Sequence, residues 1–126
     1  MEDKIIYKGE SCQIVGLCFD IFNQIGPGHR EKTYQKALAE LLNENNIKHC
    51  EQFYVSIKIN GKLIDKHFID FLIMDKIAIE LKVRDHFYKR DIDQLYSYLK
   101  SFKLKLGLLV NFSSNGVKIR RVLNNI

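Results

Sequence analysis

Three charged side chains interrupt two apolar segments near the middle of the chain. Asp70 lies in the segment 68–73, and Glu80 and Lys82 lie in the segment 77–83. Burying an unpaired charge costs several kcal/mol or forces the group to neutralise, so lone charges are not expected in such segments. Two carboxylates beside a lysine are, however, the groups that hold a divalent cation and stabilise charge on a phosphate. The residue types therefore indicate metal-assisted chemistry if folding brings them together.

The two segments are expected to form an antiparallel hairpin. Both are rich in β-branched and other apolar residues, and residues 74–76 separate them. Directly opposed residues point to the same face, so a three-residue loop places Ile73 opposite Ile77 and Asp70 opposite Glu80. A two-residue loop would instead put Asp70 on the face of the apolar residues.

With the three-residue loop, the two carboxylates are neighbours and repel each other, and a divalent cation would hold both ionised. Ligands that are all oxygen favour Mg²⁺ or Mn²⁺. Lys82 shares the face of Glu80 and would lie at the edge of this site, where an ammonium orients an attacking water or stabilises phosphate charge. The structural alternative is that Glu80 and Lys82 form a surface ion pair and Asp70 marks a strand end. The apolar surroundings weigh against that alternative.

The rest of the chain predicts one α/β domain, 1–126, with a mixed sheet and helices on both faces. Apolar residues recur at helical spacing in three segments, and Asn60-Gly61 is a strong hairpin signal. The first helix is expected to start with Ser11 as its cap, and Gly26-Pro27-Gly28 ends it. The predicted order is ααβββαββ, with helices over 11–24, about 31–44 and 92–102 and strands over 53–59, 63–73, 77–83, 106–112 and 116–122.

Composition narrows the possible functions without selecting one. The 126 residues are 46% hydrophobic and carry a net charge of +5, a modest basic excess that favours a polyanionic partner. No apolar run approaches the roughly 20 residues of a membrane span, and the first eleven residues lack the apolar core of a signal peptide, so a cytoplasmic protein is expected. Cys12, Cys18 and Cys50 show no zinc or disulfide pattern and are expected to be buried free thiols.

The spacing Asp70-x9-Glu80-x-Lys82 resembles the catalytic signature of the PD-(D/E)XK phosphodiesterase superfamily. The resemblance covers about residues 11–123 and implies the restriction-endonuclease-like core, αβββαβ, in which these residues lie on the second and third strands. The chain departs from the usual pattern at Phe68-Ile69, where an arginine or tyrosine and a small residue are expected.

Two further motifs agree with this resemblance. Gly28-x-x-Glu31-x-x-Tyr34 is the hallmark of the GxxExxY family of small proteins within the superfamily. Gln94-x-x-x-Tyr98 resembles the QxxxY motif of RecB-like nucleases. The segments 79–83 and 106–112 also resemble typical segments of the GxxExxY family, and motifs that agree in the right order are far more specific than any one of them.

The resemblance implies a role for each matching residue. Asp70 and Glu80 would be metal ligands, with the Leu81 backbone carbonyl as a third, and Lys82 would be the catalytic lysine. Glu31 would contact the metal directly or through water; its alternative role is to complement the helix dipole.

The helix after the third strand is expected to contribute to substrate binding. Gln94 and Tyr98 would line the site or position substrate, although an ordinary amphipathic helix also explains them. The preceding segment is basic and is expected to contact phosphates, with a solvated loop as the alternative. Its basic residues are Arg84, His86, Lys89 and Arg90.

The leading hypothesis is a Mg²⁺- or Mn²⁺-dependent nuclease, with DNA expected over RNA. The alternative is a catalytically inactive module that binds nucleic acid or protein on the same fold. A third hypothesis is a homodimeric junction-type nuclease, since an exposed sheet edge can support pairing.

Overall fold

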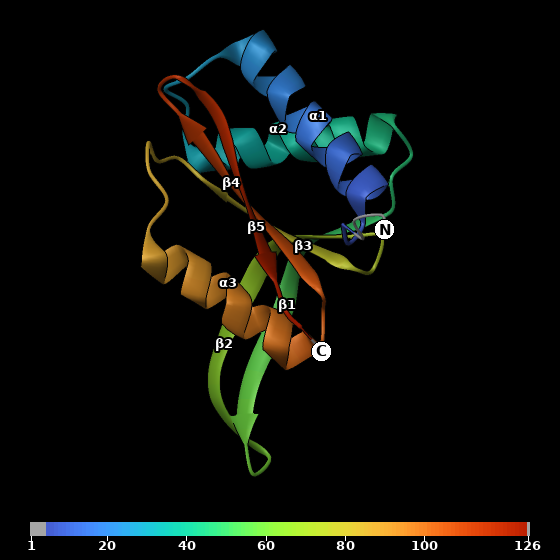
Figure 1. Ribbon diagram of the computed structural model, residues 1–126, viewed down its shortest axis with the longest axis vertical. Helices are drawn as coiled ribbons and strands as arrows, with labels where there is room; N and C mark the ends of the chain where they lie inside the picture. Colours follow the sequence, from blue (N-terminus) through green and yellow to red (C-terminus); the bar gives the residue numbers. More distant parts are fainter. Residues whose placement is uncertain (1–4, 126) are drawn as a thin grey trace.

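Three helices flank one five-stranded sheet in the computed structural model, which describes residues 5–125 (Figure 1). The elements are α1 (Lys8–Ile25), α2 (Glu31–Glu44), β1 (His49–Ile59), β2 (Lys62–Ile73), β3 (Ile77–Lys82), α3 (Lys89–Phe102), β4 (Leu106–Ser113) and β5 (Gly116–Leu123). The strands lie in the order β1-β2-β3-β4-β5. All neighbours are antiparallel except β3 and β4, which are parallel because α3 carries the chain across. The predicted element order and mixed sheet are confirmed.

Each face of the sheet has its own apolar core, as alternation along the central strand predicts. Ile79 and Leu81 of β3 pack on the side of α1 and α2. Ala78 packs on the other side, against Leu95 and Leu99 of α3. Helices therefore cover both faces, which buries β3 almost completely. Within residues 5–125, no helix is long and apolar enough to cross a membrane.

Two tight turns set the register of the first three strands. Asn60 and Gly61 have φ values of 52° and 78°, the left-handed conformation of a two-residue hairpin turn. Residues 74–76 form the three-residue loop between β2 and β3, and Ile73 pairs with Ile77. The register predicted from this loop is confirmed.

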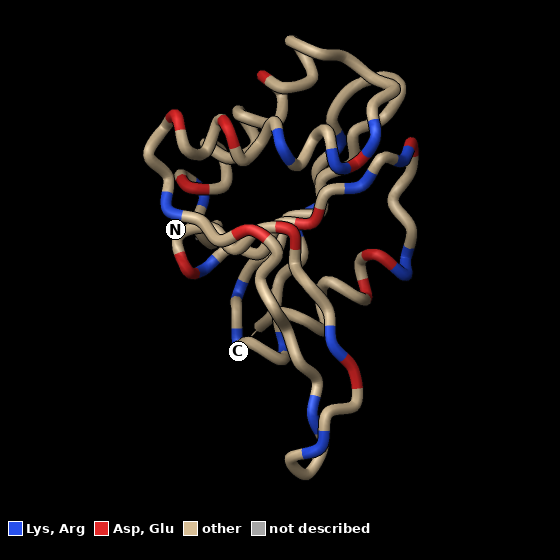
Figure 2. The backbone as a smooth tube through the Cα atoms, turned by 180° about the vertical axis from the view of Figure 1, so that it is seen from behind, with Lys and Arg blue, Asp and Glu red and all other residues tan. Residues whose placement is uncertain are grey.

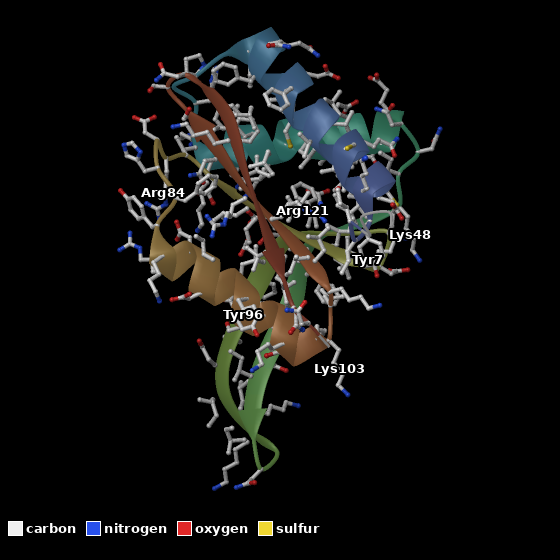
Figure 3. The ribbon with its side chains drawn as sticks, in the orientation of Figure 1. Tyr7, Lys48, Arg84, Tyr96, Lys103 and Arg121 are labelled. Carbon is white, nitrogen blue, oxygen red and sulfur yellow. The ribbon has the colours of Figure 1, made fainter. Side chains whose placement is uncertain are left out.

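The predicted start of the first helix is wrong. The helix begins at Lys8, and Ser11 lies buried in its first turn. The Ser11 hydroxyl donates to the Lys8 carbonyl (3.1 Å) and accepts from Nη1 of Arg121 (2.9 Å), which reaches α1 from β5 (Figure 3). A tertiary partner thus uses the hydroxyl that was expected to cap the helix. Strand β3 ends at Lys82, one residue before its predicted end at Val83.

The expectation that all three cysteines are buried is also wrong. Cys18 is buried on α1, and burial raises the pKa of its thiol to about 12. Cys12 and Cys50 are exposed. Cys12 belongs to the solvent side of α1, and Cys50 lies in the edge strand β1, so neither contributes to the core.

Candidate active site

Strands β2 and β3 separate where the two predicted carboxylates lie. Their backbone ladder ends at the pair Phe71 and Ile79. Beyond it, the Asp70 N–H donates to Oε2 of Glu80 (3.2 Å), and the Leu81 N–H donates to Oδ2 of Asp70 (2.8 Å). The two side chains therefore take the place of interstrand backbone bonds, which explains how the sheet accommodates charged groups at its centre.

Burial and mutual repulsion shape the electrostatics of this pair. Asp70 is 8% exposed and Glu80 is 5% exposed. Burial, followed by the negative charge of Glu80, raises the pKa of Asp70 to about 8, although the hydrogen bond from Leu81 opposes the shift. Holding both carboxylates ionised at neutral pH requires a further positive charge beside them.

Glu31 and Lys82 lie within electrostatic reach of the pair. Glu31 is the first residue of α2 and is half-buried. Burial raises the pKa of its carboxyl, with the Lys82 ammonium opposing the shift and Glu80 adding to it. Lys82 is the last residue of β3 and shares the face of Glu80 by alternation. The fold thus gathers four residues from α2, β2 and β3.

Two glutamines that sequence reasoning missed support Asp70. Nε2 of Gln35, on α2, donates to Oδ1 of Asp70 (3.1 Å), and Nε2 of Gln52, on β1, lies 3.4 Å from Oε1 of Gln35. Gln52 has a φ of 51°, which is uncommon for a residue with a side chain, and it lies opposite Asp70. A cavity of about 550 Å³ opens here, lined by Glu31, Lys32, Gln35, Lys36, Glu51, Gln52 and Asp70. The feature that distinguishes Gln52 is its left-handed backbone conformation, which a sequence does not show.

A histidine on β2, also missed, holds the second carboxylate. Nε2 of His67 lies 2.9 Å from Oε1 of Glu80, and its ring stacks on Tyr98 with centroids 4.4 Å apart. Burial and the charge of Glu80 raise the pKa of Tyr98 to about 12. Tyr98 therefore contacts His67, which in turn contacts Glu80. Gln94, on the same helix, is exposed. In the sequence, His67 directly follows the charged residues Asp65 and Lys66, so its neighbours do not set it apart.

Two residues of the basic segment after β3 form ion pairs with acidic side chains. Nε of Arg84 lies 2.7 Å from Oδ2 of the buried Asp91 (Figure 3). Lys89 pairs with Asp93 one helical turn along, and both are exposed. Arg90 is exposed as well. The segment thus presents cations at the surface near the start of α3, with Arg84 held in place by its ion pair.

The donor set fits a small hard cation. Within residues 5–125, no group of three or more His, Cys, Asp and Glu side chains has the geometry to hold a metal ion. Mg²⁺ is commonly bound through only one or two carboxylates and retains several waters. Asp70 and Glu80 supply two buried carboxylates, which is enough for a Mg²⁺ site of that kind. A bound cation would also offset the repulsion that raises the pKa of Asp70.

Comparison with known proteins places these features in context. A model of the PD-(D/E)XK nuclease superfamily matches residues 8–122. None of the curated proteins matches the chain. The crystal structure of SSO0001 aligns with a TM-score of 0.56 at 21% identity, covering 95% of this chain. An alkaline exonuclease from Laribacter hongkongensis aligns with a TM-score of 0.54 at 12% identity, covering 97%. The chain spans 58% of the first structure and 73% of the second.

Proposed function

Because the chain belongs to the PD-(D/E)XK nuclease superfamily, we propose that it is a metal-dependent nuclease that hydrolyses phosphodiester bonds of DNA rather than RNA. The observation that carries the proposal is the buried pair Asp70 and Glu80, whose mutual repulsion calls for a cation, with Lys82 on the same face. The modest positive net charge agrees with a polyanionic substrate.

The proposed ligands of the cation are Asp70, Glu80 and the Leu81 carbonyl, with Glu31 acting directly or through water. A bound Mg²⁺ or Mn²⁺ would supply Lewis-acid stabilisation of phosphate charge and lower the pKa of an attacking water. Lys82 provides a fixed ammonium that stabilises the charge developing on the phosphate. These five residues come from three elements whose packing holds them in place.

Substrate contacts are proposed for the basic surface and helix α3. Arg84, Lys89 and Arg90 would bind backbone phosphates. Tyr98 keeps His67 against the site through ring stacking, and Gln94 would meet substrate from its exposed position on the same helix.

We further propose membership of the GxxExxY family, because its motif has a clear structural task in this chain. Gly28 has a φ of 89°, a conformation that favours glycine, in the turn before α2. The buried Tyr34 hydroxyl donates to the Gly26 carbonyl (2.8 Å), and its ring stacks on Phe112 of β4. These contacts anchor the first turn of α2 to the sheet and thereby position Glu31.

A non-cleaving binding module on the same fold is the second candidate function. One observation favours it: the carboxylate oxygens of Asp70 and Glu80 already accept hydrogen bonds from protein groups. A module of this kind would bind nucleic acid or protein without requiring a cation.

Cleavage of a labelled panel separates the two functions. The panel contains single-stranded, duplex and branched DNA and RNA, tested with Mg²⁺, Mn²⁺ or EDTA. The nuclease should cut only with metal, and Lys82→Ala should lose cutting while its circular dichroism spectrum is unchanged. Lys105→Ala, at an exposed position just before β4, is the matched control. Absence of cutting on every substrate, or unimpaired cutting by Lys82→Ala, would contradict the proposal.

A further inference from the structure

The β1–β2 hairpin extends well beyond the sheet and ends in an exposed tip. Strand β2 pairs with β3 only over residues 71–73 and otherwise pairs with β1 alone. Figure 1 shows the resulting ribbon projecting from the body, at the end opposite α1 and α2. Every residue from 58 to 66 is exposed. At about 3.3 Å per residue, the ribbon reaches roughly 30 Å from Asp70 to the turn, nearly one helical turn of B-DNA.

At its base, this ribbon, residues 54–68, is covered on one face and open on the other. On the covered face, Val55 and its partner His67 pack against α3. Their neighbours Tyr54 and Phe68 form the next cross-strand pair and point to the opposite face. These two rings lie 5.5 Å apart and are 46% and 47% exposed. Because Phe68 and Asp70 are two residues apart on one strand, the open face begins beside the candidate site.

Lysines follow the aromatic pair toward the tip. Lys58 and Lys66 share the open face by alternation, and Lys62 lies at the turn, with all three exposed. Asp65 is the acidic residue among them, and its Oδ1 accepts the Lys66 backbone N–H (2.8 Å). Figure 2 shows the blue segments on both strands of the ribbon. The ribbon therefore offers a row of cations at a spacing that suits a polyanion.

The tip also exposes large apolar side chains, which a solvated hairpin does not need. Ile59 and Ile64 are each 61% exposed, and Leu63 is 54% exposed. A register shift between Ile57 and Lys58 makes Ile64 the extra residue of a β-bulge. Two-stranded ribbons enter DNA grooves, and apolar side chains at such contacts insert between base steps.

We propose that this hairpin is an arm that binds double-stranded nucleic acid next to the candidate active site. Its lysines contact phosphates along the duplex, Tyr54 and Phe68 lie against the sugar-phosphate edge, and the apolar tip enters a groove. The inference rests on the proposed function in taking nucleic acid as the substrate, and it adds the duplex form and the surface that holds it. Charge complementarity favours this occupant over a second copy of the chain, whose arm would bring the same lysines into contact.

The test is duplex binding by the full chain in EDTA, so that cleavage plays no part. Fluorescence anisotropy with a labelled 30-base-pair DNA duplex would be measured across a range of salt concentrations. The arm variant is Lys58→Gln, Lys62→Gln and Lys66→Gln. The charge-matched control is Lys8→Gln, Lys48→Gln and Lys105→Gln, at exposed positions outside the arm; Figure 3 shows Lys48 away from the ribbon.

The arm variant should bind more weakly, and its plot of log K against log salt should be flatter by about 2 to 3, close to one per phosphate contact. The control should keep nearly the wild-type slope. Equal slopes in the wild type and the arm variant would overturn the inference, as would equal flattening in the control. Equal losses on a 30-nucleotide single strand would overturn the duplex assignment.

Sedimentation without DNA tests the competing occupant. A wild-type dimer that the arm variant loses would assign the ribbon to self-association and overturn the inference. The proposed function is tested independently. Duplex binding that depends on the arm, without metal-dependent cutting, would contradict the nuclease function and support the arm. Metal-dependent cutting with duplex binding that does not depend on the arm would support the nuclease function and contradict the arm.

Discussion

Replacing Asp70 by asparagine should remove most of the pH dependence of stability between about pH 5 and pH 8. Burial and the charge of Glu80 raise the pKa of Asp70 from 3.8 to about 8. In the unfolded chain this carboxyl titrates near its ordinary value, so in this window the folded protein binds a proton that the unfolded chain does not. The free energy of unfolding of the wild type therefore falls as the pH rises.

The expected size of this fall follows from the shift in pKa. One pKa unit corresponds to about 1.4 kcal/mol, so the wild type should lose about 2 to 4 kcal/mol across the window. The variant D70N retains an oxygen for the Leu81 N–H, and Gln35 can turn its amide to suit the new NH₂ group. Its free energy of unfolding should therefore change little with pH in this range.

Urea denaturation in EDTA, followed by circular dichroism at several pH values, measures both slopes. Asp20→Asn, at an exposed position of α1, is the control and should fall with pH as the wild type does. Adding Mn²⁺ should restore wild-type stability near pH 8 and have little effect near pH 5, because the cation binds the ionised pair. Parallel curves for D70N and the wild type would refute the reasoning, since Asp70 would then be ionised throughout.

Three further substitutions test individual contacts. His67→Phe retains a ring for stacking but loses the hydrogen bond to the β3 carboxylate, so Mn²⁺ affinity measured by electron paramagnetic resonance should fall about tenfold; unchanged affinity would rule out a positioning role. Tyr34→Phe leaves the Gly26 carbonyl without its partner and should cost about 1 kcal/mol in urea denaturation. Gly107→Ala places a Cβ 3.0 Å from the Leu95 side chain and should cost about 1 to 3 kcal/mol by the same measurement; no loss would mean that α3 shifts freely.

The paired carboxylates show how far local sequence patterns can lead. Alternation along β3 and a three-residue loop were enough to predict that Asp70 lies next to Glu80, because register follows from loop length and side-chain period. The helix after β3 was equally clear from its spacing. The way the pair is accommodated was not predicted, because β2 pairs with β3 only over residues 71–73, and the point where two strands separate is set by the packing of the whole sheet.

The sequence by itself determined the element order, the sheet with helices on both faces, and the carboxylate pair, since each depends on periodicity or turn chemistry within a short segment. Only the tertiary structure decided which polar groups meet that pair. Gln35 reaches Asp70 from α2, His67 reaches Glu80 from β2, and Arg121 donates to the Ser11 hydroxyl from the last strand. Contacts between segments distant in the chain are set by how the layers pack, and no local period encodes them.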